Sequence, residues 1–147
     1  MLSRRLLLAS LLALAAAPAK QVLAATPTFF RNPGCGCCEA WTQRMAEVGM
    51  PVAMEDRDDL SAYSSQLGIP AGLEGCHVGE IDGYVISGHV PPDDIKRLLA
   101  EKPKARGLLV PGMPMGSPGM EMGDHKDRYD VLLLSVDGAT TVFATHS

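Results

Sequence analysis

The chain has 147 residues, with 13 Lys and Arg residues against 17 Asp and Glu residues and a formal net charge of −4 at pH 7. This acidic balance, without a basic patch, argues against a nucleic-acid-binding protein. Beyond residue 25 no apolar stretch is long enough to span a membrane, and the remaining 122 residues suffice for one compact domain but not for two.

Residues 1–25 are predicted to be an export signal peptide. Arg4 and Arg5 give it a charged start, residues 6–17 form an apolar run, and small residues follow. A membrane anchor is disfavoured, because a run of 12 residues is too short to cross a bilayer. The arginine pair also fits a twin-arginine signal, so both export routes stay open. Residues 26–147 are then the mature domain, and a bacterial periplasm or its equivalent is the expected location.

The mature chain begins with alternating strands and helices. Turn residues separate four predicted elements, a strand at 28–31, a helix at 37–48, a strand at 52–55 and a short helix at 58–67. Asp82-Gly83 is a strong two-residue hairpin signal between strands at 77–81 and 84–87. A further helix begins at 91–94 and ends before Lys102. The order βαβαββα is that of a thioredoxin-like α/β fold.

Two segments follow that helix. Residues 107–123 contain five Gly, three Pro and four Met, a composition that predicts an irregular, methionine-rich loop without regular secondary structure. Residues 129–136 and 140–145 flank Asp137-Gly138, which predicts an additional C-terminal β-hairpin.

The four cysteines are the main chemical signal. Cys35, Cys37 and Cys38 lie where the first strand meets the first helix, and Cys76 directly precedes the third strand. In a thioredoxin-like arrangement that strand begins beside the helix start, so the fourth sulfur is expected next to the other three. A helix N-terminus favours thiolate over thiol, and thiolates are soft ligands that select Cu(I). We therefore predict a copper site formed by all four cysteines.

Other uses of the cysteines are less well suited to this spacing. Two ordinary disulfides would leave crowded sulfurs, because a bridge from Cys37 to Cys35 or Cys38 closes a very small ring. A zinc site from three cysteines and His77 is an alternative, but adjacent cysteines suit tetrahedral closure poorly. The segment also departs from the usual thioredoxin redox motif, although Cys35 and Cys38 are three residues apart.

Methionine and histidine side chains are candidate additional ligands. The loop methionines follow no helical period, so a core role loses its main support, and Met113 and Met120 are predicted to contact copper. The alternative is a loop that only covers the domain. His77 is predicted as a ligand or as a donor to one. His89 is expected to be a structural histidine at a strand end, and His125 and His146 are expected to be solvated.

The combined motifs resemble those of a known family. They are residues 32–38 (NPGCGCC) with Trp41, residues 67–70 (LGIP), Cys76-His77, Gly83-Tyr84, residues 88–91 (GHVP) and residues 110–121 (VPGMPMGSPGME). Over about residues 28–122 the chain is similar to the exported CopG copper-resistance proteins, a domain-of-unknown-function family of metal-binding proteins. The resemblance implies a thioredoxin-like fold, a cysteine-bound copper site that can take the form of a multinuclear cluster, and a role in periplasmic copper tolerance.

These observations favour an exported copper-binding protein for copper tolerance that holds Cu(I) and interconverts Cu(I) and Cu(II), which would make it a copper oxidoreductase. A passive copper chaperone or sponge needs the same ligands and stays open beside it. A thiol–disulfide oxidoreductase that uses Cys35 and Cys38, with Cys37 or Cys76 resolving, is a third interpretation. Copper ions are the expected partners, and other periplasmic copper-handling proteins are further candidates.

Overall fold

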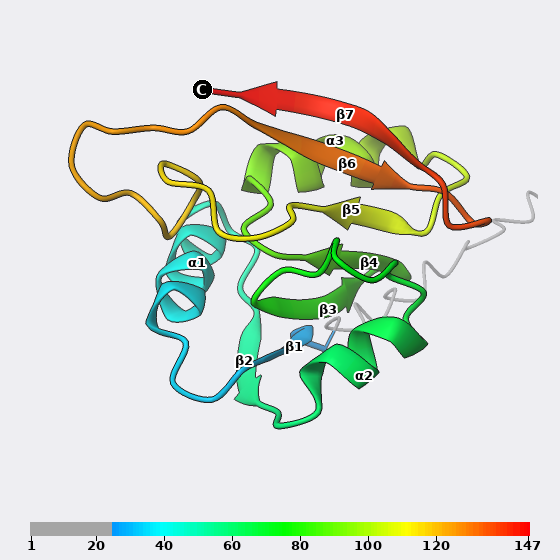
Figure 1. Ribbon diagram of the computed structural model, residues 1–147, viewed down its shortest axis with the longest axis horizontal. Helices are drawn as coiled ribbons and strands as arrows, with labels where there is room; N and C mark the ends of the chain where they lie inside the picture. Colours follow the sequence, from blue (N-terminus) through cyan, green and yellow to red (C-terminus); the bar gives the residue numbers. More distant parts are fainter. Residues whose placement is uncertain (1–24) are drawn as a thin grey trace, which may run out of the picture.

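The computed structural model describes residues 25–147, which form three helices and one seven-stranded sheet (Figure 1). The predicted signal peptide lies, except for its last residue, outside the described residues. Within residues 25–147 no helix combines the length and apolar character needed to cross a membrane.

The sheet has the strand order β2-β1-β3-β4-β5-β6-β7. Its strands are β1 (Thr28–Arg31), β2 (Ala53–Asp56), β3 (His77–Ile81), β4 (Tyr84–Ser87), β5 (Gly107–Leu109), β6 (Tyr129–Leu134) and β7 (Thr140–His146). The helices are α1 (Gly36–Glu47), α2 (Leu60–Gln66) and α3 (Pro92–Glu101). The chain is thus a mixed α/β protein whose first seven elements follow the predicted order, and the C-terminal hairpin extends the same sheet.

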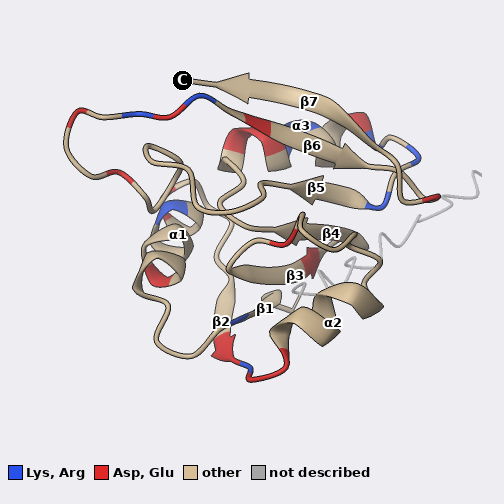
Figure 2. Ribbon diagram, in the orientation of Figure 1, with Lys and Arg blue, Asp and Glu red and all other residues tan. Residues whose placement is uncertain are grey.

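Helices cover both faces of the sheet. The larger core cluster joins Trp41 of α1 and Leu98 of α3 to one face, and the smaller cluster places Leu60 of α2 on the other. Successive residues of a strand point to opposite faces, so Leu108 belongs to the first cluster and Leu109 to the second. Figure 2 shows acidic residues at the end of β2 and at the start of α3.

The prediction that residues 107–123 lack regular structure is wrong at their beginning. Residues 107–109 form β5, which pairs parallel with β4 and antiparallel with β6. All three of its residues are buried, as expected for a short strand covered on both faces. Through β5 the C-terminal hairpin becomes part of the main sheet, and the methionine-rich loop begins only where β5 ends.

Candidate metal centre

The sheet register brings the lone cysteine to the cysteine trio. Cys35 occupies the N-cap position of α1, and Cys37 and Cys38 lie in its first turn. Strands β1 and β3 run antiparallel, so the residue after β1 faces the residue before β3. The backbone N–H of Asn32 accordingly donates to the carbonyl oxygen of Cys76 over 3.4 Å. The predicted proximity of Cys76 to the other three cysteines is confirmed.

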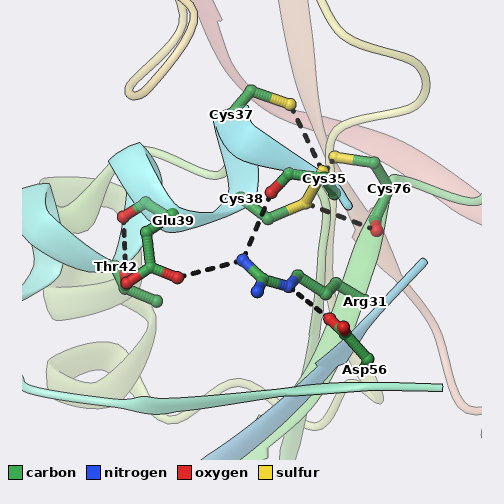
Figure 3. A network of polar contacts seen from close by, with 8 residues as sticks. All are labelled: Arg31, Cys35, Cys37, Cys38, Glu39, Thr42, Asp56 and Cys76. Carbon is green, nitrogen blue, oxygen red and sulfur yellow. Dashed lines mark hydrogen bonds and ion pairs between the residues drawn. A yellow bond between two sulfur atoms is a disulfide. The ribbon is translucent and has the colours of Figure 1, made fainter. Parts of the chain in front are cut away.

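The four Sγ atoms form one compact cluster (Figure 3). All of them lie within 4.8 Å of one another. Cys37 Sγ is 3.4 Å from Cys35 Sγ, and Cys76 Sγ is 3.4 Å from Cys38 Sγ. Four sulfur atoms at such separations offer several donors to one soft cation or shared donors to more than one.

Two of the four sulfurs are joined, because Cys35 and Cys38 form a disulfide and Cys37 and Cys76 are free. The segment departs less from the usual redox motif than its sequence indicates, because the three-residue spacing of Cys35 and Cys38 allows a disulfide at the start of α1. A metal can use all four sulfurs only after this disulfide has been reduced.

His77 extends the donor set beyond sulfur. Its ring is fully buried, with the ring centroid of Trp41 4.4 Å away. Its Nδ1 lies 3.5 Å from Cys76 Sγ, and its Nε2 is buried without a hydrogen-bond partner among the described residues. Nδ1 is thus the ring nitrogen that faces the thiol and can act as a donor beside it, whereas the unpartnered Nε2 is a cost of burial.

His89 is a buried histidine just after β4 with partners at both ring nitrogens, as expected for a structural histidine at a strand end, and it also lies beside Cys76. The ring is fully buried, and its Nε2 lies 3.1 Å from Cys76 Sγ. Its Nδ1 lies 2.8 Å from the carbonyl oxygen of Pro118. Because a carbonyl oxygen only accepts, Nδ1 carries the proton and the lone pair of Nε2 faces the sulfur. Cys76, His77 and His89 thus form a second group of potential ligands.

The two remaining histidines lie outside the site. His125 is 71% exposed, which confirms that it is solvated. The same prediction for His146 is wrong, since its Nε2 lies 2.6 Å from Asp94 Oδ2 and its ring stacks on Tyr129 with centroids 5.3 Å apart.

Burial determines the protonation states of the cysteine and histidine side chains in the site. It raises the pKa of the Cys76 thiol to about 12, and nearby Cys37 adds to the effect. Burial also lowers the pKa of His77 well below its ordinary value, with His89 contributing, and lowers the pKa of His89 itself. At neutral pH Cys76, which lies before β3 and not at the start of a helix, is therefore a thiol beside neutral imidazoles. A metal ion binding there must displace the thiol proton.

Two glycines allow three backbone segments to meet behind the site. A Cβ on Gly75 would lie 2.2 Å from the Cα of Gly88, and a Cβ on Gly88 would lie 2.2 Å from the carbonyl oxygen of Val110. These glycines directly precede Cys76 and His89, respectively. The close approach therefore fixes the spacing between the sulfur and the imidazole.

The methionine-rich loop reaches the cluster at one of the two predicted methionines. Met113 Sδ lies 3.8 Å from Cys37 Sγ, and its side chain is 53% exposed. An isolated β-bridge between Gly75 and Gly112 holds the preceding residue against the segment that leads to Cys76. The structure thus brings Met113 to the cluster at its solvent side.

Met120 follows a glycine that packs tightly on α1, but its own side chain makes no contact with the cysteine sulfurs. It is half-buried, and within residues 25–147 no sulfur contact joins it to a cysteine. Its neighbour Gly119 packs so closely on α1 that a Cβ there would lie 2.6 Å from the backbone nitrogen of Trp41. An ion pair of 3.0 Å between Arg44 and Glu121 also ties the loop to α1. In this arrangement the loop covers the site through its backbone.

Arg31 secures the loop that carries the cysteines (Figure 3). Its guanidinium group donates to the carbonyl oxygen of Cys35 over 3.3 Å, to Glu39 of α1 over 2.9 Å and to Asp56 of β2 over 2.7 Å. These contacts connect β1, which ends just before the site, with α1, which begins in the site.

The buried imidazoles predict that acid destabilises the metal-free protein. Their depressed pKa values mean that the unfolded state binds protons that the folded state does not, so stability is lost as the pH falls below about 6.5. From pH 7.5 to 5.5 the free energy of unfolding should fall by about 2 kcal/mol. Urea unfolding followed by Trp fluorescence measures this.

The control for this prediction is an exposed histidine. His89→Gln should reduce the pH dependence, whereas His125→Gln should leave it unchanged, because His125 is largely exposed. A free energy of unfolding that is flat over this pH range would contradict the assignment of two neutral buried rings.

Met113 and Met122 provide a matched pair for testing the thioether. Met113→Ala should weaken Cu(I) binding by about 3-fold to 10-fold, because it removes one soft donor beside Cys37. Met122 is 65% exposed in the same loop, so Met122→Ala should leave the affinity unchanged. Competition with a Cu(I) chelator under anoxic conditions measures both. Equal affinities for the two variants would show that Met113 only covers the cluster.

Comparison with known proteins gives one family match and two similar solved structures. The family described as "Protein of unknown function, DUF411" matches residues 73–120. Form 1 of a copper resistance protein CopG has 42% sequence identity and a TM-score of 0.78, covering 82% of this chain and 96% of that one. Form 2 has 41% identity and a TM-score of 0.78, covering 83% and 98%. No curated protein sequence matches the chain.

Proposed function

The chain belongs to the family of the copper resistance protein CopG, and from this membership and its sulfur cluster we propose that it is an exported copper-tolerance protein that holds Cu(I) and interconverts Cu(I) and Cu(II). The observation that carries the proposal is the set of four cysteine sulfurs within 4.8 Å of one another. Copper is here the cargo and substrate of the protein.

The donor set fits monovalent copper. Thiolate and thioether sulfur are soft donors that select Cu(I), and imidazole also suits copper. The neutral state of His77 and His89 leaves a ring nitrogen of each residue available beside Cys76, Nδ1 of His77 and Nε2 of His89. Cys35, Cys37, Cys38 and Cys76 are the proposed principal ligands, with His77, His89 and Met113 beside them. Met120 is proposed as a ligand only if the methionine-rich loop moves when copper binds.

The number of donors supports a cluster of more than one copper ion. Bridging thiolates let several ions share a small group of sulfurs, and the second donor group around Cys76 adds nitrogen ligands on the buried side. Export to the periplasm by the segment at residues 1–25 is part of the proposal, as is exchange of copper with other periplasmic copper-handling proteins.

A second candidate function is supported by the disulfide between Cys35 and Cys38. Each sulfur of this disulfide at a helix start has a free cysteine sulfur 3.4 Å away, so thiol–disulfide exchange within the cluster needs little movement. Metal-free protein that rearranges a scrambled disulfide substrate would support this function. A passive chaperone or sponge remains the alternative without turnover.

Cu(I) loading of reduced protein tests the main proposal. Protein reduced and purified without air should bind at least one Cu(I) per chain, and X-ray absorption should show mainly sulfur neighbours. Protein with the disulfide intact is the control and should bind less copper. A copper environment dominated by nitrogen and oxygen, or no retention against a Cu(I) chelator, would contradict the proposal.

Turnover separates the redox function from passive storage. Steady consumption of oxygen or reductant at catalytic amounts of protein would support interconversion of Cu(I) and Cu(II). A single stoichiometric burst would support the passive chaperone or sponge.

A further inference from the structure

The four sulfurs divide into two pairs with different bonding. Cys35 and Cys38 are joined, whereas Cys37 and Cys76 are free, and each free sulfur lies 3.4 Å from one sulfur of the disulfide. We propose that the reduced pair Cys35 and Cys38 is the electron source that reduces Cu(II) ions, while Cys37 and Cys76 hold the Cu(I) produced. This inference rests on the proposed copper function. It makes the two thiols of the protein the source of the electrons that reduce Cu(II).

The reaction balances for two copper ions. The two thiols of Cys35 and Cys38 each lose a proton to solvent and one electron, and a bond forms between their sulfurs. Each of two Cu(II) ions gains one electron and becomes Cu(I). The products are one disulfide, two Cu(I) ions and two protons. A dithiol donor must return two electrons and two protons to the disulfide before the same chain can react again.

The position of the pair suits this step. Cys35 and Cys38 are three residues apart on the first turn of α1, with Cα atoms 5.4 Å apart, within the range that a disulfide spans without backbone movement. Arg31 holds the carbonyl oxygen of Cys35 and ties it to the body of α1 through Glu39. The disulfide between Cys35 and Cys38 can therefore form and break while the backbone around it stays in place.

The free sulfurs are placed to receive the product. Cys76 has His89 Nε2 at 3.1 Å, and Cys37 has Met113 Sδ at 3.8 Å. Each free thiol thus keeps a second soft or borderline donor after the disulfide has formed. Because these donors favour Cu(I), binding of the product favours the reduction.

The competing assignment is a disulfide between Cys38 and Cys76, whose sulfurs are also 3.4 Å apart. That bridge would consume the thiol that faces both histidines and would leave the buried nitrogens without a sulfur partner. The two assignments differ in which cysteines remain free after the reaction, and peptide mapping can distinguish them.

The experiment adds two equivalents of Cu(II) to fully reduced, metal-free protein without air. The Cu(II) paramagnetic resonance signal should disappear, and removal of copper with a Cu(I) chelator followed by alkylation should show two thiols lost. Peptide mapping should find Cys35 bridged to Cys38, with Cys37 and Cys76 alkylated. A persistent Cu(II) signal, or a bridge that includes Cys76, would overturn the inference.

A pair of variants and a second copper source complete the test. Met122→Ala, at an exposed loop residue outside the cluster, should still reduce two Cu(II) ions, whereas Cys38→Ser should not form the disulfide within the first turn of α1. Supplying copper directly as Cu(I) examines binding without electron transfer. Tight binding of Cu(I) together with failure to reduce Cu(II) would refute only the electron-source role, while failure to bind Cu(I) would refute the proposed function.

Discussion

Replacing Cys76 by serine should weaken Cu(I) binding by more than about 100-fold, which corresponds to about 2.7 kcal/mol. Cys76 is the one residue common to both groups of potential ligands, the four cysteines and the group with His77 and His89. A serine hydroxyl is a hard donor that Cu(I) does not favour, so both groups would lose their shared sulfur. Competition with a Cu(I) chelator on reduced protein measures the affinity.

Cys37→Ser is the matched comparison. Cys37 lies at the solvent side of the cluster next to Met113, and it has no part in the histidine group. Its replacement should lower the number of coppers bound but reduce the affinity less than Cys76→Ser does. Far-ultraviolet circular dichroism checks that both variants stay folded. Affinity within about threefold of the unmodified protein in Cys76→Ser would refute the central role of this sulfur.

The sequence was sufficient to predict the cysteine cluster because local signals and the element order agree. The hairpin at Asp82-Gly83 forms as predicted, with Ile81 opposite Tyr84 and Val78 opposite Ser87. Continued by two residues, this register sets Cys76 opposite His89. The role of His89 could therefore have been predicted from the hairpin alone, had the register been extended past the strand ends.

Other features depend on contacts that leave no local pattern. Strand β5 is three residues long and directly precedes a loop rich in Gly, Pro and Met, so composition over the whole segment conceals it. Its strand character comes from pairing with β4 and β6. The contact between His146 and Asp94 likewise joins residues 52 positions apart on β7 and α3.

The division of the cysteines into joined and free sulfurs is also a tertiary result. In sequence the trio is crowded, and the pairing of Cys35 with Cys38 is only one alternative, that of a thiol–disulfide oxidoreductase. In the structure Cys35 is the N-cap of α1 and Cys38 lies in the first turn, which turns their side chains toward each other, while Cys37 points toward Met113. The helical frame therefore selects the pair.

Replacing Gly88 by alanine should destabilise the protein by about 2–5 kcal/mol, the largest stability effect that we expect near the site. Gly88 has a φ of +77°, where an L side chain costs about 1–2 kcal/mol. The added Cβ would also lie 2.2 Å from the carbonyl oxygen of Val110, a backbone atom of a buried residue that cannot move aside without distorting the chain where it leaves the interior strand β5. Such overpacking adds about 1–3 kcal/mol.

Gly83 separates these two contributions. It has nearly the same φ, +81°, but no atom lies within 4 Å of its virtual Cβ, so Gly83→Ala should cost only the conformational part, about 1–2 kcal/mol. Urea unfolding of both metal-free variants gives the difference. Gly88→Ala should also weaken Cu(I) binding, because a displaced Gly88 moves His89 away from Cys76, whereas Gly83→Ala should keep the affinity. Equal destabilisation by the two alanines would mean that the backbone behind the site can shift to make room for the added Cβ. In that case the close approach of Gly75, Gly88 and Val110 would not fix the distance between the Cys76 sulfur and the His89 imidazole.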